Sequence, residues 1–528
     1  LNASQRSLAT TGHNIANVNN PDFSRQRVDL TTELPQREGR HFVGTGVQVE
    51  GIDRVYDSFL ATQLRTHTST VERFTALDEL TGQLDSLVAD PDASLAPSLE
   101  GFFAAAADLA NDPASIPARQ ALLSNAGSLT ARFQDLDRQM DTLRQGIDTS
   151  IRTTIAQVNG LAQSIAAANQ DIVLAQGATG RAPADLLDHR DGLLRELSTQ
   201  VAVQVVPDDS GAVNVFIGKG QGLVLAETAQ VLVVDHHPFD PQLIGVRFEG
   251  QEQAADLSPV LIGGRIGGLL EFRDQILTPA QNRLGLLATG LGEQVNAIHQ
   301  QGYDLQGAPG EPLFATAPAR VLSHSGNSAG QDTVTVTITD TAALTHSDYE
   351  LRYTGSGYSL RRSQDGLERT LSGAGPHQID GLSIDIQGGT PVSGDRFMIQ
   401  PTRNGAGQLE LMLSDPRQLA AGLTPINPGA NPPPIGVGLT SAPHAPGDNR
   451  NALALAGLQT QRPLLEGRAG YQEFYGQLVG EVGSQGQRVG DSLTANQVLL
   501  QQTVAVRESV SGVNLDEEAA NLMRFQQA

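Results

Sequence analysis

The feature that most constrains the fold is one long stripe of apolar residues in the first third of the chain. Between residues 133 and 172 apolar residues recur every three or four positions, with Asn169 in the one gap: Phe133, Leu136, Met140, Leu143, Ile147, Ile151, Ile155, Val158, Leu161, Ile165 and Ile172. This period predicts a helix of roughly 45 residues, about 65 Å long, ending near Gly177 and Gly180. Because such a helix is stabilised mainly by burial of its stripe, it needs partner helices alongside.

Helical periods also mark the two ends of the chain. Leu1, Leu8 and Ile15 repeat at seven-residue spacing, and this helix is predicted to end near Asn17. Near the other end, Asn514 is predicted to cap a last helix, with Asp516 and Glu517 in its first turn, where acidic groups are favoured. An apolar stripe before it comprises Val482, Val489, Leu493, Leu500 and Val504. Further helices are predicted over residues 53–87, 99–109, 267–299 and from 449 onward.

Two stretches change to the alternating period that is typical of strands. The first, residues 201–248, alternates in its centre at Val213, Val215 and Ile217. Over residues 316–402 several such runs are separated by turn residues, which predicts a compact all-β insert. Residues 23–52 are extended and polar in character. Asn427–Gly447 is rich in Pro, Gly and Asn and is predicted to be a surface loop or linker.

This order of elements predicts an α+β multidomain fold with a nested architecture. A long α-helical bundle or coiled-coil core is built from both chain ends, which then lie at one end of a rod, and the β insert projects from that rod. The expected division has three parts. A terminal helical axial domain comprises residues 1–62 and 486–528. A mainly helical middle domain comprises residues 63–315 and 403–485, with a β region at about 200–260, and an inserted all-β outer domain comprises residues 316–402.

Composition and charge exclude several classes of function. The chain of 528 residues carries a net charge of -23, which repels phosphate backbones and anionic membrane surfaces, so we expect neither nucleic-acid binding nor membrane insertion. It has no Cys, which excludes disulfides, thiolate metal sites and cysteine nucleophiles. Neither a membrane-spanning apolar run nor a signal peptide is visible. Because the chain starts at Leu1 rather than Met, we expect it to be a fragment.

Two clusters suggest chemistry at first sight. Gly218–Gly222 resembles a phosphate-binding loop, but the apolar run that follows it indicates a strand rather than a helix, so we interpret it as a hairpin turn. Adjacent histidines beside Pro238 suggest metal ligands. Because adjacent histidines seldom both reach one ion, we predict no metal site at Asp235, His236, His237 and Asp240.

A third cluster, formed by Asp185, Asp188, His189 and Asp191, puts several titratable groups on one short predicted helix. Arg190 is near, so we interpret the cluster as a solvated face with ion pairs. The chain has no H-E-x-x-H pair. We therefore predict that it is not an enzyme and that it uses no cofactor or metal.

Sequence signatures lie at both ends of the chain. Leu8–Arg25 reads LATTGHNIANVNNPDFSR, which is similar to the run that closes the first helix of flagellar rod, hook and hook-associated axial proteins. Here Pro21, Asp22 and Phe23 replace the more usual small residue, Gly and Tyr. Ser511–Gln527 reads SGVNLDEEAANLMRFQQ, which resembles the signature of the hook-associated protein 1 family.

The middle of the chain agrees with this resemblance. Asp112–Leu122 reads DPASIPARQAL and Leu186–Asp191 reads LLDHRD, and both resemble segments of the same family. The resemblance covers most of the chain and is weakest in residues 316–402 and in the loop after Asn427. Proteins of the family extend beyond both ends of this sequence, so we expect the terminal helices to be incomplete.

The resemblance implies a structural subunit of the bacterial flagellum that joins hook to filament. Members of the family form a short ring stack at the distal end of the hook, where their terminal helices pair as a coiled coil around the export channel. They are exported unfolded through the flagellar type III pathway, with a cytoplasmic chaperone on the C-terminal region, and they act outside the cell. The implied partners are the hook protein, the second hook-associated junction protein and other copies of the chain.

The residues expected to mediate this assembly lie on the terminal stripes. These stripes are too thin to fold alone, so we expect them to pair with each other and with neighbouring subunits, while Asn17 shapes the joint after the first helix. The expected residues are Leu8, Ile15, Asn17, Leu515, Leu522 and Phe525. Two other functions stay open. A secreted binding module would act through the β insert, although the aromatic content of 4% argues against it, and a hydrolase would need a cleft with paired carboxylates, of which the sequence gives no sign.

Overall fold

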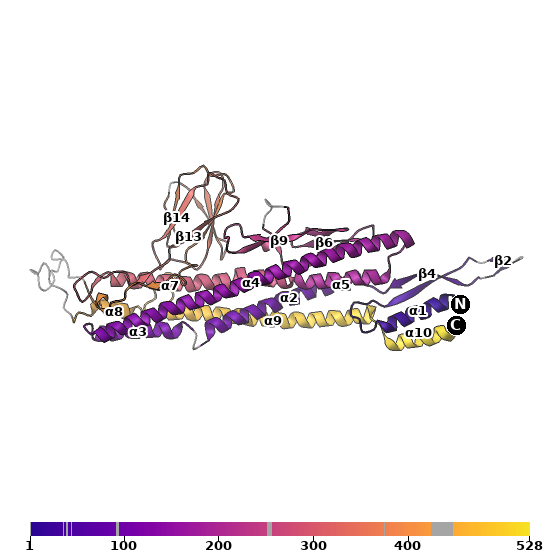
Figure 1. The fold of residues 1–528 in the computed structure, drawn as a ribbon, viewed down its shortest axis with the longest axis horizontal. Helices are drawn as coiled ribbons and strands as arrows, with labels where there is room; N and C mark the ends of the chain where they lie inside the picture. Colours follow the sequence, from indigo (N-terminus) through magenta and orange to yellow (C-terminus); the bar gives the residue numbers. More distant parts are fainter. Residues whose placement is uncertain are drawn as a thin grey trace, which may run out of the picture.

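The computed structural model describes residues 2–34, 36–38, 41–43, 45–90, 94–250, 256–373, 375–423 and 447–527. Its helices lie side by side in an elongated rod, a β domain stands on one flank, and both chain ends lie at the same end of the rod (Figure 1). Of the predicted loop Asn427–Gly447, all but Gly447 lies outside the described residues, as does Leu1.

The predicted long helix forms the spine of the rod. This helix, α4, spans Ile116–Thr179, which makes it 64 residues long, and the roughly 45 residues predicted from its stripe were an underestimate. The added turns are at its start, where Ser115 caps the helix with its side chain. Gly180, in the left-handed conformation at φ 78°, follows its last turn, as predicted. The apolar stripe is buried except at Leu143 and Leu161, which are partly exposed.

Further helices pack along this spine and against one another. The prediction that the second helix begins at residue 53 is wrong, because β4 continues to Arg54. The helix begins after Asp57, whose side chain accepts hydrogen bonds from the N–H groups of Phe59 and Leu60. These helices are α2 (Ser58–Ala89), α3 (Ala96–Asn111), α5 (Ala184–Gln200), α8 (Arg450–Gly457) and α9 (Tyr471–Ser511).

The helix predicted over residues 267–299 begins earlier and is not uniform. It starts as α6 (Gly264–Glu271), widens into the π-helical turn η2 (Phe272–Leu277) and continues as α7 (Thr278–His299). Pro279 has no N–H to donate to the carbonyl four residues before it, which is a local reason for the departure from the α-helical pattern. Phe272 and Leu277 are fully buried, so the π turn lies in the core.

The β region predicted within residues 201–248 forms two small antiparallel sheets beside α4. Its first sheet has the order β5-β6-β7-β8, and the second pairs β9 with β10. Gly218–Gly222 spans the turn of the β6–β7 hairpin, which confirms that interpretation. The strands are β5 (Val203–Pro207), β6 (Val213–Ile217), β7 (Gln221–Leu225), β8 (Thr228–Ala229), β9 (Leu232–His236) and β10 (Ile244–Phe248).

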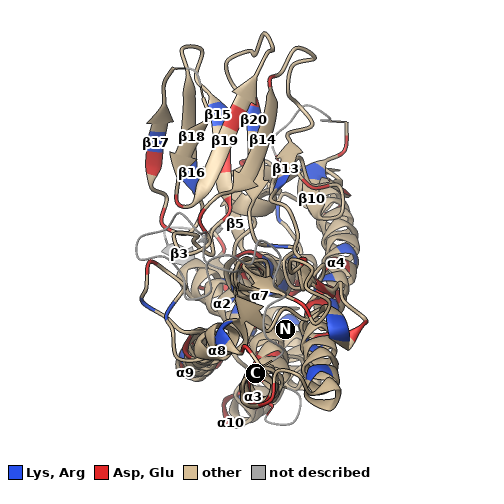
Figure 2. Cartoon of the chain, turned by 90° about the vertical axis from the view of Figure 1, so that its left-hand side faces the viewer, with Lys and Arg blue, Asp and Glu red and all other residues tan. Residues whose placement is uncertain are grey.

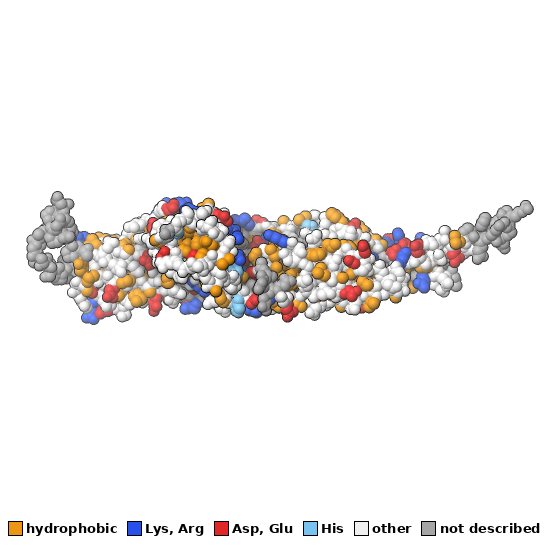
Figure 3. All heavy atoms as spheres, turned by 90° about the horizontal axis from the view of Figure 1, so that it is seen from above, with side chains coloured by type: hydrophobic (Ala, Val, Ile, Leu, Met, Phe, Trp, Pro, Cys, Tyr) orange, Lys and Arg blue, Asp and Glu red, His pale blue; other side chains and the backbone are white. Residues whose placement is uncertain are grey.

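The predicted all-β insert consists of two antiparallel sheets, of order β13-β20-β15-β16-β17 and β14-β19-β18. A view along the rod shows the strands standing over the helices (Figure 2), and a view from above shows hydrophobic side chains in the centre of the insert (Figure 3). The strands are β13 (Arg320–Ser323), β14 (Thr333–Ile338), β15 (Tyr349–Tyr353), β16 (Tyr358–Arg362), β17 (Glu368–Leu371), β18 (His377–Ile379), β19 (Leu382–Gln387) and β20 (Arg396–Gln400).

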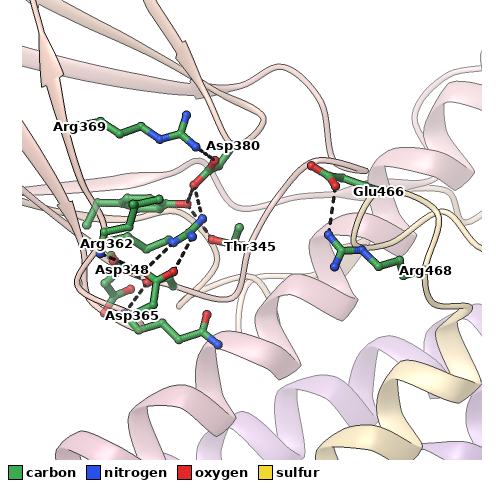
Figure 4. A network of polar contacts seen from close by, with 12 residues as sticks. Thr345, Asp348, Arg362, Asp365, Arg369, Asp380, Glu466 and Arg468 are labelled. Atoms are coloured by element: carbon green, nitrogen blue, oxygen red, sulfur yellow. Dashed lines mark hydrogen bonds and ion pairs between the residues drawn. The ribbon is translucent and has the colours of Figure 1, made fainter.

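The base of the insert is tied to the helices by charged side chains. Asp348 is buried and accepts hydrogen bonds from Asn282 on α7, at 3.1 Å, and from Arg403. Burial raises the pKa of Asp348, and the Arg403 guanidinium opposes that rise. Within the insert, Arg362 donates to Asp380 at 3.0 Å (Figure 4). The insert is therefore anchored to the rod by polar contacts with definite geometry.

Short strands on either side of the insert pair with each other, so the two connections leave the rod together. These pairs are β11 (Gly302–Tyr303) with β22 (Gly422–Leu423) and β12 (Phe314–Ala315) with β21 (Glu410–Leu411). Two short 3-10 turns, η1 (Ser258–Val260) and η3 (Pro416–Gln418), lie in connecting segments.

The terminal part pairs the first helix of the chain with the last. The first, α1 (Asn2–Ala16), packs against α10 (Leu515–Gln527) and against β1 and β4. Between α1 and α2 the chain forms an extended hairpin that runs past the helices (Figure 1), in agreement with the extended character predicted for residues 23–52. Its strands are β1 (Gln26–Thr32), β2 (Gln36–Glu38), β3 (His41–Val43) and β4 (Val47–Arg54).

Candidate assembly site at the joint of the terminal helices

The terminal helix pair leaves its apolar side chains incompletely buried. On α1, Leu8 and Ile15 are partly exposed, and the buried residues of this helix are all polar: Ser7, Thr10, Thr11 and Asn14. On α10, Leu522 and Phe525 are partly exposed and Leu515 is 50% exposed. The structure thus brings together the two helices that carry the predicted assembly residues, but one chain alone does not cover their apolar faces.

A single asparagine, Asn14, ties α1 to the strand that follows it. Its side-chain amide donates to the Gln26 carbonyl at 2.9 Å and accepts from the Gln26 N–H at 3.0 Å, and it is buried. Asn17, the predicted joint residue, is partly exposed and donates to the His13 carbonyl at 3.0 Å, so its contact lies within the last turn. The sequence indicated the right kind of residue, but the longer-range contact belongs to Asn14.

The two terminal signatures bind each other at Arg25. The Arg25 guanidinium donates to both carboxylate oxygens of Glu517, at 2.7 and 2.9 Å, and to Glu518 at 2.7 Å. The Arg25 N–H donates to the Ser511 carbonyl at 2.9 Å, at the end of α9. The side chain of Glu518 is only 2% exposed, so this is a buried charge held by a charge-assisted hydrogen bond.

These contacts shift the pKa values of Arg25 and Glu517. The hydrogen bond to Glu517 is the largest cause that raises the pKa of Arg25, and the same bond lowers the pKa of Glu517. Asn514 caps α10, as predicted, because its side chain accepts from the N–H groups of Asp516 and Glu517. The start of α10 is therefore held both by its own cap and by an arginine from the other end of the chain.

The acidic cluster on α5 forms the other side of this joint. Asp188 accepts from the Ser24 N–H at 2.9 Å and from Arg54 at 2.8 Å, and Arg54 also donates to Asp191 at 2.6 Å. Asp188 is buried, so the interpretation as a solvated face is wrong for this residue. His189 is exposed, and the cluster does form ion pairs, through Arg54. Burial raises the pKa of Asp188, and hydrogen bonds from Ser24 and Arg54 oppose the rise. Asp185, by contrast, is exposed and accepts from Gln26 at 2.6 Å.

Arg190, the arginine of the LLDHRD segment, faces away from this joint and into the rod. It donates to the side chain of Asn169 on α4 at 3.1 Å and to the Gly211 carbonyl at 2.8 Å. Burial lowers the pKa of Arg190. The same short segment therefore holds the terminal part with its aspartates and the β region with its arginine. The clustering of Asp185, Asp188, Arg190 and Asp191 in the sequence was the available signal, but it does not reveal which residues they contact.

An open hollow of about 930 Å³ lies beside the joint, between the end of α1 and helices α2, α5 and α9. Its lining includes Leu500 and Val504, two members of the apolar stripe predicted on α9. Of that stripe only Val482 is fully buried. Beyond the hollow the last turns of α9 expose further apolar side chains, with exposed fractions of 43 to 48%: Val498, Leu499, Val506 and Val510.

The aspartates of the predicted non-metal cluster at Asp235–Asp240 accept hydrogen bonds from neighbouring residues. Asp235 accepts from Arg247 at 2.6 Å, and the Asp240 carboxylate accepts from the Gln242 N–H at 3.0 Å. Within the described part of the chain, no three or more His, Asp or Glu side chains are grouped so that they could hold a metal ion. Over the same residues no helix is long and apolar enough to cross a membrane.

A helical rod with paired chain ends, a joint built from the two terminal signatures and an outer β domain is the organisation of a structural subunit. Two family models match the chain: the helical domain of flagellar hook-associated protein FlgK over residues 81–314, and the D2-like domain of flagellar hook-associated protein 1 over residues 322–401. The chain is 31% identical to flagellar hook-associated protein 1 of Salmonella typhimurium, over all of this chain and 94% of that protein. It therefore belongs to the flagellar hook-associated protein 1 family.

Other relatives agree with this assignment. Flagellar hook-associated protein 1 of Escherichia coli K12 is 29% identical, over all of this chain and 94% of that protein. The structure of the flagellar hook junction protein FlgK from Burkholderia pseudomallei superposes with a TM-score of 0.76 at 26% identity, covering 85% of this chain and 100% of that one. The family is a structural one, so the chain is a flagellar structural protein and not an enzyme.

Proposed function

We propose that this chain is the subunit that joins the flagellar hook to the filament, and that it assembles at the distal end of the hook after export through the flagellar type III pathway. It then acts outside the cell and performs no catalysis. The observation that carries the proposal is the likeness to flagellar hook-associated protein 1 over the whole chain, from one terminal signature to the other. The paired ends with incompletely buried apolar faces support it.

The partners follow from this place in the assembly. One face of the subunit contacts the hook protein and the other contacts the second hook-associated junction protein, while copies of the chain contact each other around a ring. Before export, a cytoplasmic chaperone covers the C-terminal region. In support, α9 and α10 carry apolar side chains that are about half exposed, such as Val506, Leu515 and Met523. Exposed apolar side chains that continue along one element are typical of interaction sites.

The proposed mechanism is geometric. A terminal axial domain, residues 1–62 and 486–528, packs against its copies, and the middle and outer domains, residues 63–485, form shells farther from the axis. In the assembly, burial of Leu8, Ile15, Leu515, Leu522 and Phe525 by neighbouring subunits supplies free energy at about 25 cal/mol per Å² of apolar surface. Asn17 shapes the turn that follows α1. Because each contact is repeated around the ring, modest contacts add up to a stable junction.

Deletion of the gene tests the function directly. We expect cells that carry hooks without filaments, with filament protein released to the medium, when they are examined by electron microscopy. Normal filaments on the deletion strain would exclude the junction role. In that case a secreted binding module acting through the β insert would become the better hypothesis.

Substitutions on α10 test the mechanism. Leu522→Asp or Phe525→Asp places a charge on the face that neighbouring subunits are proposed to cover, so we expect a folded middle domain but no incorporation at the hook. The measurement is filament formation after the variant gene is returned to the deletion strain. Gln526→Asp is the matched control, because Gln526 is exposed on the same helix. Full filaments with Leu522→Asp would contradict packing through this face.

A further inference from the structure

Two neighbouring residues, Ser24 and Arg25, connect four elements of the molecule. The Ser24 N–H donates to Asp188 on α5, and the Arg25 N–H donates to the last residue of α9, Ser511. The Arg25 carbonyl accepts from the Val55 N–H at 2.8 Å, just before α2. The Arg25 side chain binds Glu517 and Glu518 at the start of α10. We call Ser24 and Arg25 the crossing.

The Arg25 side chain differs in one respect from the other contacts of the crossing. The backbone bonds hold α5, α9 and the start of α2, all of which belong to or adjoin the rod. The guanidinium holds α10, which packs chiefly against α1. Because it makes three hydrogen bonds to two successive residues of one helix turn, it restricts both the position and the rotation of α10.

A buried carboxylate makes this contact specific. Glu518 is 2% exposed on its side chain, and a buried carboxylate without its cation is strongly unfavourable. An α10 that swung away from the rod would separate Glu518 from Arg25, and one that rotated about its axis would break the paired bonds to Glu517. The ion pair therefore favours one orientation of the terminal helix pair over others of equal apolar burial.

We propose that Arg25 is a positioning residue for assembly, which sets the orientation of the α1–α10 pair relative to the rod through Glu517 and Glu518. This inference rests on the proposed junction function and deepens it. The apolar faces of the pair supply the free energy of packing between subunits, and the Arg25 ion pair presents those faces at the angle that the neighbouring subunit requires. The two signatures at opposite ends of the sequence are thus two halves of one joint.

Charge exchange in the intact chain tests the proposal. Arg25→Glu puts three carboxylates together at the joint, so we expect loss of filament formation when this variant is returned to the deletion strain. Arg25→Glu combined with Glu517→Arg restores one guanidinium between two carboxylates, and we expect it to recover filaments. Arg247→Glu is the matched control, because Arg247 pairs with the carboxylate of Asp235 and its side chain is 22% exposed, against 23% for Arg25. We expect normal filaments with that control.

A distance measurement on the purified full chain separates positioning from general stability. Spin labels on Gln527 and on the exposed His189 position would report the separation of α10 from α5. We expect one narrow distance distribution for the parent chain, a broad or shifted one for Arg25→Glu, and a narrow one for the exchanged pair. In all three proteins the thermal unfolding of the rod should stay the same.

The outcomes distinguish this inference from the function on which it rests. If the deletion strain has normal filaments, the junction role fails. If the parent gene restores filaments and Arg25→Glu restores them equally, the positioning role fails while the junction role stands. The exchanged pair must recover filaments and must also recover the narrow distance distribution. If it fails to recover either one, the positioning role is overturned.

Discussion

The spine of the rod and the terminal helix pair bury opposite kinds of surface. On α4 the buried positions include Phe133, Leu136 and Met140, each at 0% exposure, whereas the buried positions of α1 are Ser7, Thr10, Thr11 and Asn14. The apolar residues of α1 and α10 are left partly exposed. The rod therefore gains its stability within one chain, whereas the terminal pair leaves apolar surface exposed, which the proposed function assigns to contacts with neighbouring subunits. If the proposed function holds, we expect substitutions in the rod to change stability and substitutions in the terminal pair to change assembly.

The largest effect on stability is expected from the spine. Phe133→Ala removes a fully buried ring from α4 and leaves a cavity, so we expect the rod to lose about 3–5 kcal/mol of its free energy of unfolding. Urea unfolding followed by far-UV circular dichroism measures this loss. Leu174→Ala on the same helix is the control, because Leu174 is 64% exposed and should cost little. A loss below about 1 kcal/mol for Phe133→Ala would mean that the spine is not the core of the rod.

A smaller effect is expected from polar contacts along the same helix. Asn169 is fully buried and bonds both the N–H and the carbonyl of Val213 on β6, at 3.1 and 2.8 Å. Asn169→Leu leaves the N–H and the carbonyl of Val213 without these hydrogen bonds, so we expect the free energy of unfolding to fall by about 2–3 kcal/mol. Asn159 makes the same pair of bonds to Leu232 but is partly exposed, so water can replace it. Equal losses for Asn159→Leu and Asn169→Leu in urea unfolding would contradict the role of burial.

The next largest effect is expected from acid, which should weaken the attachment of the outer domain to the rod. Burial, helped by Arg283 and Arg362, lowers the pKa of His346 from 6.5 to about 4. A lowered pKa in the folded state means that His346 stabilises the fold fully above pH 6.5, and that this stabilisation is lost as the pH falls toward about 4.

Thermal unfolding between pH 7 and 4 measures this effect. We expect the midpoint of the outer-domain transition to fall with pH, and His346→Gln to reduce that dependence. His377→Gln is the control, because His377 lies on β18, whereas His346 lies in the loop before β15. An unchanged pH dependence in His346→Gln would show that other groups cause the acid effect.

The smallest effect on stability is expected from the terminal pair itself. Phe525→Ala in the isolated chain removes a ring that is partly exposed, so we expect a loss below about 1 kcal/mol in the same urea experiment. The same substitution should nevertheless reduce filament formation, because neighbouring subunits are proposed to cover this ring. A loss comparable to that of Phe133→Ala would remove the distinction between the two regions.

Much of the fold could be predicted from residue periods, because a period reports which face of an element is buried. The stripe of α4, the alternation at Val213, Val215 and Ile217, and the β insert were all visible in this way. The start of α4 was not, because the turns before Phe133 carry a mixed pattern around Arg119. That arginine is fully buried and donates to the carbonyls of Pro113 and Leu419. A buried cation in a helix reads as a surface residue until its partners are known.

Asparagines illustrate the same limit within regular elements. Asn is a poor former of helix interiors, so its presence in a helical stripe reads as a gap. In the structure, four helix asparagines each bond both the N–H and the carbonyl of one residue in a neighbouring strand, with the pairs Asn14–Gln26, Asn159–Leu232, Asn169–Val213 and Asn296–Phe314. Each asparagine satisfies strand groups that would otherwise need another strand.

The sequence by itself determined the helical rod and the β insert, because these depend on local periods. It also determined the resemblance to a flagellar family, because that depends on motifs read along the chain. Only the tertiary structure decided which charges meet. Arg25 and Glu518 are 493 residues apart in sequence, and Arg54 and Asp188 are 134 apart. Ion pairs need a few ångströms of distance and a defined orientation, and these exist only after the apolar stripes have packed and brought distant segments of the chain together.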